Sequence, residues 1–382
     1  MRIRTVCVAA GLATVWPSMV LAQSLYQHRV TAPVGLSYDS NLGLSETSPG
    51  GVYRLNVSPS YTLTRKAGGD ELELKLGAFL EQSSDTAISR NRQDGNARLS
   101  WRTASDTTLW GWHAAYEQIA ARAALLEETG QLSDDGTRTT RALGAQMAHE
   151  LDERHVLSLM ADVKWHTYDF GNTPDHRLGN AQVEWSRAAA PGHDWLVSAS
   201  VSQYAPDTVA ATGAAHATAT HSVQRGLLLG YRSQVQGSPW DWQIRAGVAR
   251  FTGTFSDTMP QGEAKLGYQN PRWRHSASLS RLPVANNLLG SFAPNTQARW
   301  RTEYRWSEYT TLALDASHNR TQASQTEATR QLGLQVSTEL SPLWRMTAQW
   351  RNTQADRFVA GVPAQASNHS ASLVFTYLHP DF

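Results

Sequence analysis

Arginine supplies most of the basic residues of this chain. Of 34 lysine and arginine residues only four are lysines, which leaves 30 arginines. Several concentrate in the last third of the chain, namely Arg272, Arg274, Arg299, Arg301, Arg305, Arg345 and Arg351. A guanidinium can bind carboxylate or sulfate through paired hydrogen bonds, contact sugar hydroxyls and stack on rings. The cluster therefore indicates either a wall that binds an anionic polysaccharide or a ladder of charges paired with acids such as Glu303.

The sequence carries no recognisable signature of a catalytic or metal site. The 13 histidines show no HExxH and no repeated short spacing, and neither a phosphate-binding glycine loop nor a GxSxG elbow is present. Cys7 is the only cysteine. We therefore expect no metal ion, no other cofactor and no enzyme activity. A barrel-embedded hydrolase stays open as an alternative, because Ser, His and Asp on separate strands can form a site that sequence spacing does not reveal.

The first 22 residues have the layout of a secretory signal peptide. Arg2 and Arg4 precede an apolar run over 6–15, and Val20-Leu21-Ala22 supplies small-residue cleavage chemistry before Gln23. Removing residues 1–22 leaves a nearly neutral chain, which gives no electrostatic reason to expect nucleic acid as a partner. We expect residues 23–382 to form one exported domain.

From about residue 28 to 378 the chain repeats segments in which apolar and polar residues alternate. In one segment Leu72, Leu74 and Leu76 alternate with charged residues, and in another Trp300, Thr302 and Tyr304 alternate with Arg299, Arg301 and Glu303. A period of two places one set of side chains in an apolar medium and the other in water. The pattern predicts 18 strands, near 28–43, 51–64, 70–83, 91–102, 107–120, 137–150, 154–169, 176–187, 194–205, 218–232, 239–255, 262–269, 273–285, 296–306, 308–319, 328–339, 343–356 and 367–378.

The connections between these segments alternate in length. Short ones include 66–69, 104–106, 152–153, 236–238, 270–271 and 341–342, and the longer ones fall at 121–136, 206–217, 286–295 and 357–366. Short turns at one end and long loops at the other are typical of transmembrane barrels. The strands are also longer than the five or six residues usual in a soluble β-sandwich. We therefore predict an all-β fold, a transmembrane antiparallel up-and-down β-barrel of about 18 strands in the outer membrane of a Gram-negative bacterium.

Tryptophan and tyrosine cluster near the predicted strand ends. They include Trp110, Trp112, Tyr116, Trp240, Trp242, Tyr304, Trp306 and Trp344. Such amphipathic rings fit the aromatic girdles of membrane interfaces, although aromatic residues also favour strands in general.

A barrel of this size leaves an aqueous lumen. On the predicted phasing, Arg274, Arg299, Arg301, Glu303 and Arg305 face it. The segment 118–128 is rich in helix formers and stops at Gly130. We hypothesise that this segment folds inward as a constriction, by analogy with the third loop of diffusion porins. Its candidate residues are Arg122, Leu125, Leu126, Glu127 and Glu128, and a short helix outside the barrel is the alternative.

The run Gly35-Leu36-Ser37-Tyr38-Asp39-Ser40-Asn41-Leu42-Gly43-Leu44, followed by Val57-Ser58-Pro59-Ser60-Tyr61, resembles the opening of the beta-barrel porin type 2 family of proteobacterial outer-membrane barrels. The run Asn91-Arg92-Gln93-Asp94-Gly95-Asn96, leading into Ala97–Trp101, is similar to a later strand entry of that family. Here Ser40 replaces the first residue of the family's Asp-Asn pair. Some members are encoded with exopolysaccharide operons.

The resemblance implies an outer-membrane component of exopolysaccharide export, working with periplasmic polysaccharide-export proteins, and it carries over no catalytic residue. A general or substrate-selective diffusion porin for small solutes is the main alternative. For either function the expected partners are outer-membrane lipid, lipopolysaccharide and the outer-membrane assembly machinery.

Overall fold

The computed structural model describes residues 25–129, 135–170, 174–207, 221–252, 257–286, 291–322, 326–359 and 362–379. The predicted signal peptide, residues 1–22, lies outside the described residues. Within those ranges, no helix is both long enough and apolar enough to cross a bilayer.

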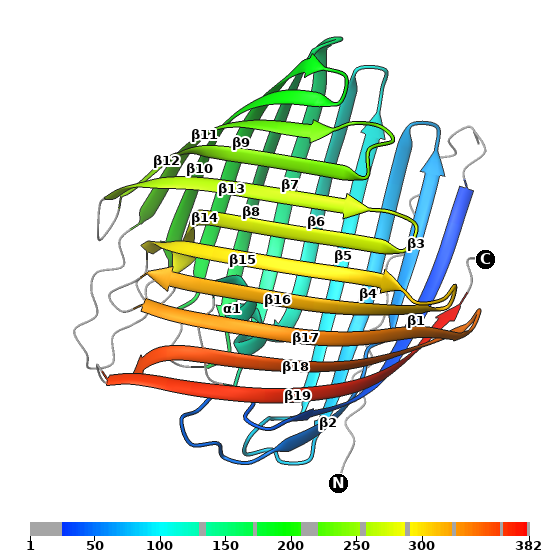
Figure 1. Cartoon of the computed structure of the whole chain (residues 1–382), viewed down its shortest axis with the longest axis vertical. Helices are drawn as coiled ribbons and strands as arrows, with labels where there is room; N and C mark the ends of the chain where they lie inside the picture. Colours follow the sequence, from blue (N-terminus) through cyan, green and yellow to red (C-terminus); the bar gives the residue numbers. More distant parts are fainter. Residues whose placement is uncertain are drawn as a thin grey trace, which may run out of the picture.

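Almost all described residues belong to one antiparallel sheet (Figure 1). Its segments are β1 (Leu25–Asp39), β2 (Val52–Val57), β3 (Ser60–Ala67), β4 (Asp70–Ser83), β5 (Arg92–Ala104), β6 (Thr108–Ala120), β7 (Thr137–Asp152), β8 (His155–Tyr168), β9 (His176–Ala190), β10 (His193–Pro206), β11 (Ser222–Gln234), β12 (Trp240–Thr252), β13 (Asp257–Gln269), β14 (Trp273–Asn286), β15 (Ser291–Arg305), β16 (Thr310–Gln322), β17 (Thr326–Ser341), β18 (Trp344–Val359) and β19 (Val362–His379). The single helix of the described residues, α1 (Ala121–Thr129), follows β6 directly.

Segments β2 and β3 are two halves of one strand. Both pair with β1 on one side and with β4 on the other, and the register is the same in both halves. The interruption falls at Ser58-Pro59, where the proline has no N–H to donate to the ladder. The described segments therefore make 18 strands, as the alternation predicts.

The sheet closes on itself. Strand β1 pairs with β19 over ten residue pairs, from Val30 opposite His379 to Asp39 opposite Ser370. Every strand therefore has a hydrogen-bonded neighbour on both sides, which is the condition for a sheet that spans lipid. The predicted antiparallel up-and-down barrel is confirmed.

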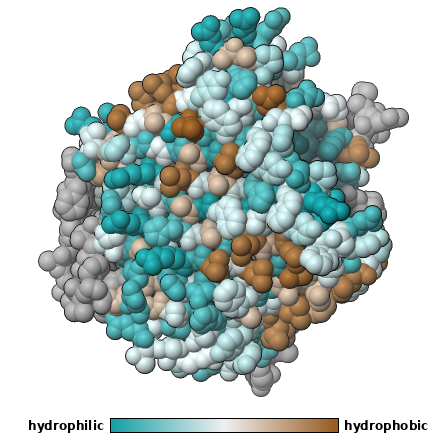
Figure 2. Space-filling view, in the orientation of Figure 1, coloured by the Kyte–Doolittle hydropathy of each residue, from teal (hydrophilic) through white to brown (hydrophobic). Residues whose placement is uncertain are grey.

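Alternate side chains face opposite sides of the wall. Large apolar side chains on the outer face remain exposed, among them Leu229 at 59% and Leu279 at 55%. Apolar patches on the visible face lie among polar residues (Figure 2). In a soluble protein such exposure would be costly, whereas in a membrane these side chains meet hydrocarbon. The inner face carries Arg, Glu, Asp, Asn, Gln and Ser.

Aromatic residues ring the outer face at the short-turn end. Trp195, Trp240, Trp273 and Trp344 each lie near the start of a strand, and each packs on a tyrosine near the end of a neighbouring strand, with ring centroids 4.5–5.4 Å apart. This arrangement matches the girdle expected at a membrane interface.

Two of the four predicted long loops are wrong. Strands β14 and β15 are still paired at Asn286 and Ser291, and β18 and β19 are paired up to Val359 opposite Val362. Pro294 made the first segment resemble a loop, but it lies opposite Pro283 in a hairpin tip that extends beyond the pairing with β13 and β16. Proline is tolerated there because no outer neighbour needs its N–H. Of the other two predicted loops, 121–136 contains α1, and most of 206–217 lies outside the described residues.

Candidate functional site: the barrel lumen

Helix α1 lies inside the barrel and crosses its lumen. It starts where β6 ends, and it contacts β6, β7 and β16. Strand β16 is roughly halfway around the ring of 18 strands from β6, so a segment that touches both must cross the interior. Figure 1 shows α1 between the wall formed by β4–β9 and the wall formed by β13–β19. The structure thus places the helix in the lumen and not outside it.

The C-terminal end of α1 is fixed to two opposite walls. Both oxygens of Glu128 accept hydrogen bonds from Arg138 of β7, at 2.6 and 2.7 Å. The Arg138 side chain is only 5% exposed, so this bidentate pair is shielded on the arginine side. On the far wall Thr321 of β16 donates its hydroxyl to the carbonyl oxygen of Thr129. Together these contacts hold the helix across the channel.

An apolar contact fixes the middle of the helix. Leu126 packs against Leu44, Ala355 and Ala366, which come from the β1–β2 loop and from β18 and β19. Leu44 adopts a left-handed conformation with φ 47°, unusual for a residue with a branched side chain. The Asn41 side chain stabilises this turn by bonding both the N–H and the carbonyl of Ser45. The β1–β2 loop therefore also folds into the lumen.

A cavity of about 680 Å³ remains between α1 and the wall formed by β12–β18. Helix residues Ala123, Leu126 and Glu127 line one side of it. The opposite wall is polar, with Lys265, Arg299, Arg301, Asp315 and Arg351 among amide and hydroxyl side chains. A second cavity of about 290 Å³ lies between α1 and β1, β2, β18 and β19, and it shares Leu126 and Arg351 with the first.

Three of the predicted lumen residues meet as one charge cluster. Glu303 lies 2.8 Å from Arg301 and 3.8 Å from Arg274. One carboxylate is thus shared between two guanidinium groups, which is the paired ladder considered as the alternative to a binding wall. The fifth predicted residue, Arg305, is exposed at the short-turn end of β15.

Two of the arginines that line the larger cavity lack an acidic partner in the described part of the chain. Arg299, a predicted residue, makes no ion pair there and lies beside the side-chain amide of Gln297. Arg351 was in the predicted arginine cluster but was not singled out as a lumen residue. Its Nε is buried without a hydrogen-bond partner in the described structure. Within this cavity Arg299 and Arg351 are therefore the arginines with unused capacity for an anion.

The predicted constriction residues have different environments. Leu126 and Glu127 line the larger cavity, and Arg122 lines the smaller one. Leu125 is buried, and Glu128 is occupied by Arg138. The helix therefore presents an apolar residue and an acid to the arginine wall.

Most other lumen arginines are paired with acids that sequence reasoning did not connect. Arg245 bridges Glu184 and Glu263 at 2.8 and 3.3 Å, and Arg54 bridges Asp39 and Glu81. Glu263 stands directly opposite Arg245 on the next strand, whereas Glu184 lies on β9. Only the cross-strand register reveals such pairs.

An apolar cluster covers part of the inner wall near the long-loop end. Tyr204, Phe251, Met259 and Phe292 are buried together. Phe292 belongs to the β14–β15 hairpin tip, and its neighbour Ser291 lies 3.4 Å from Ser222 of β11 between the hydroxyl oxygens. The tip therefore leans over β12 and β13 and narrows the lumen from a second side. The described residues contain no group of three side chains suited to hold a metal ion.

No model of a known protein family matches this chain, and no curated protein is similar to it in sequence. Among solved structures, a BenF-like porin from Pseudomonas fluorescens Pf-5 is 11% identical, with 94% of this chain and 99% of that chain covered and a TM-score of 0.51. Pseudomonas aeruginosa OccK2 (OpdF) is 11% identical over 93% of this chain and 98% of its own, with a TM-score of 0.51.

Pseudomonas aeruginosa OccK9 (OpdG) is 9% identical over the same shares of both chains, with a TM-score of 0.51. At these identities the similarity is one of fold, and the shared fold is that of an outer-membrane porin barrel. With its closed wall and apolar outer face, the chain is a β-barrel of the Gram-negative outer membrane.

Proposed function

We propose that this barrel is a substrate-selective diffusion channel for small anionic solutes, sugar acids among them. The observation that carries the proposal is the pair Arg299 and Arg351, which line one cavity and make no ion pair with a described acid. Through water, a guanidinium about 4 Å from an anion contributes about 1 kcal/mol, a roughly fivefold preference per arginine. Helix α1 keeps solutes close to that wall.

A structure with the same fold supports the choice of solute class. Pseudomonas aeruginosa OccK2 (OpdF), 11% identical with a TM-score of 0.51, has been solved in complex with glucuronate. A sugar acid combines a carboxylate, which suits a bidentate arginine, with hydroxyls, which suit the Gln, Ser and Asn side chains of the cavity wall.

Solute uptake by liposomes that contain the purified barrel tests the proposal. We expect glucuronate to enter several times faster than glucose, a neutral sugar of similar size. Arg299→Gln with Arg351→Gln should remove most of that advantage. Arg281→Gln with Arg320→Gln is the matched control, because it removes the same two charges from the outer face of β14 and β16. Equal entry of both sugars into wild-type liposomes would refute the proposal.

Exopolysaccharide export, the function implied by the family resemblance, draws no support from the comparisons. A helix fixed to both walls also leaves less room for a polymer than an open barrel would. Gene deletion followed by staining for surface polysaccharide separates the two functions. Loss of surface polymer with unchanged uptake of small anions would favour export. We expect instead that the deletion leaves surface polymer unchanged and reduces uptake of small anions.

A further inference from the structure

Arginines also occur on the outer face of the barrel, at its long-loop end. Directly paired residues of an antiparallel ladder point to the same face, and these arginines pair or alternate with exposed apolar residues. They are Arg141, Arg177, Arg225, Arg250, Arg281 and Arg320, all exposed and all within six residues of the long-loop end of their strands. This position places them at the edge of the apolar band.

These outward arginines come in three pairs. Arg225 of β11 stands directly opposite Arg250 of β12. Arg141 and Arg177 flank Trp165 in one cross-strand row. The third pair, Arg281 and Arg320, flanks Thr296 in the same way.

The pairs have no acid to neutralise them within the described residues, where none of the six makes an ion pair. Outward Arg330, by contrast, lies 3.2 Å from Asp356. Like charges directly opposite one another destabilise a sheet. Arg225 and Arg250 carry this cost directly, and all three pairs lack an ion pair within the described residues. Such an arrangement indicates an anion supplied by the surroundings, and phosphate is an anion that guanidinium groups bind through paired hydrogen bonds.

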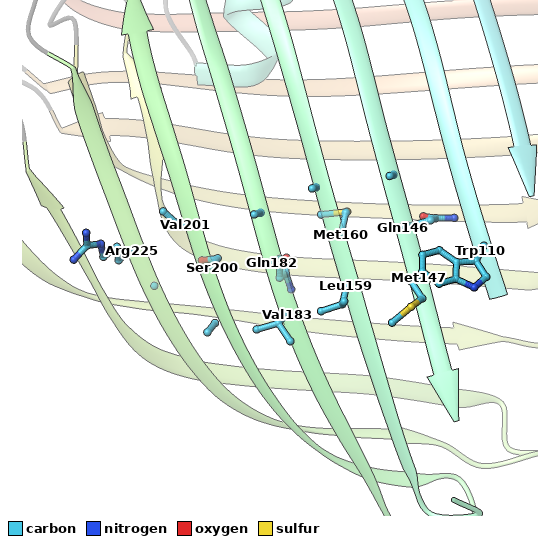
Figure 3. Close-up of a pocket in the computed structure, with 15 residues that line it drawn as sticks. Trp110, Gln146, Met147, Leu159, Met160, Gln182, Val183, Ser200, Val201 and Arg225 are labelled. Carbon is cyan, nitrogen blue, oxygen red and sulfur yellow. The ribbon is translucent and has the colours of Figure 1, made fainter. Parts of the chain in front are cut away.

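An apolar groove leads to one of these pairs. Its floor is a cross-strand row of small side chains, Ala145, Ala161 and Ala181, which continues through Val201 to Arg225. Larger side chains, Trp110, Met147, Leu159 and Val183, line it, and its volume is about 680 Å³. Figure 3 shows Arg225 at one end of the groove and Trp110 at the other.

The dimensions of the groove suit a lipid chain. Four steps between strands, each about 4.8 Å, make the row from β7 to β11 about 19 Å long. Because barrel strands are tilted, a row perpendicular to them runs obliquely through the bilayer, one leaflet of which is about 15 Å deep. A second outer groove, of about 780 Å³, is lined by Leu74, Leu99 and Leu143 and includes Arg141.

We propose that these outer grooves and arginine pairs bind lipopolysaccharide, with lipid A phosphates on the arginines and acyl chains along the alanine floor. Long loops face outward in bacterial barrels, so the arginines lie at the outer leaflet, where this phosphorylated glycolipid resides. The site is on the outside of the wall and does not depend on what passes through the lumen.

Native mass spectrometry of the purified barrel with added lipid A tests this site. We expect bisphosphorylated lipid A to bind at least tenfold more tightly than dephosphorylated lipid A. Arg225→Gln with Arg250→Gln should weaken binding of the bisphosphorylated form tenfold or more. The matched control is Arg65→Gln with Arg187→Gln, two exposed outward arginines at the short-turn end, which should change the Kd less than twofold.

A second variant tests the groove without changing charge. Ala181→Phe fills the alanine floor on the lipid-facing side, where an aromatic residue is compatible with a strand, and it should also weaken lipid A binding. Heat-modifiable gel migration shows that each variant is folded. The proposal is overturned if the arginine variant binds like the wild type, if removing the phosphates changes nothing, or if phosphatidylglycerol competes equally. It is also overturned if a second barrel occupies the groove. That outcome would appear as a dimer mass in the wild type that is absent from Ala181→Phe.

Discussion

Removing helix α1 should roughly double the conductance of the channel. Deleting residues 121–134 joins Ala120 to Asp135, and Ala120 is paired with Thr137. The deletion therefore leaves Asp135-Gly136 as a two-residue connection between β6 and β7, the sequence that favours a tight hairpin turn. The barrel wall should close normally without the helix.

The expected size of the effect follows from the dimensions of the helix and the lumen. Eighteen strands about 4.8 Å apart and tilted about 40° give a backbone cylinder roughly 35 Å across, and side chains narrow it to about half. That opening has an area of roughly 250 Å². A helix of nine residues lying across it is about 14 Å long and about 10 Å wide, so it blocks roughly half of the opening.

Single-channel recording in planar bilayers at high salt measures the effect. A second variant, with residues 121–134 replaced by a Gly/Ser segment of equal length, keeps the chain length but removes the helix and its contacts with Arg138 and Thr321. We expect conductance to rise in both variants, with more current noise in the second. Unchanged conductance in the deletion variant would refute the constriction.

Two further predictions concern stability. A Cβ added at Gly247 would lie 1.9 Å from the Leu227 carbonyl oxygen, so Gly247→Ala should destabilise the barrel by about 1–3 kcal/mol and lower the temperature at which its gel mobility changes. Gly179→Ala, with nothing within 4 Å of the added Cβ, should have little effect. Burial alone would raise the pKa of Asp169, but hydrogen bonds from Arg90 and the Thr137 N–H hold it below its ordinary value near 4. This contact should therefore stabilise the long-loop end of the barrel above about pH 4 and weaken as the pH falls further. Asp169→Asn should accordingly lower thermal stability more at pH 7 than at pH 3, and an equal loss at both values would contradict this assignment.

The wall of the barrel is predictable from sequence because its signal is local. The alternation of apolar and polar residues along Leu72–Leu80 or Trp300–Tyr304 predicts which residues face lipid. Counting such segments predicts the 18 strands that the structure shows. The break at Ser58-Pro59 did not disturb the count, because the register continues unchanged across it.

The interior of the lumen is less predictable because its contacts join distant strands. The composition of 118–128 indicates a helix, but only the ring closure shows that it meets β16. Likewise, nothing near Arg299 or Arg351 in sequence distinguishes them from Arg245, which is neutralised by Glu184 and Glu263. Whether an arginine is available to a solute depends on the register of its neighbours. The outer arginine pairs are not predictable from sequence for the same reason, since Arg225 and Arg250 become neighbours only through the β11–β12 pairing.

The reversal potential of the purified channel under a salt gradient tests the central claim most directly. An arginine wall with unused charge predicts that chloride permeates in preference to potassium. Arg299→Gln with Arg351→Gln should remove most of this preference, while Arg281→Gln with Arg320→Gln should leave it intact. A cation-selective wild-type channel, or an anion preference that survives loss of both lumen arginines, would contradict the account.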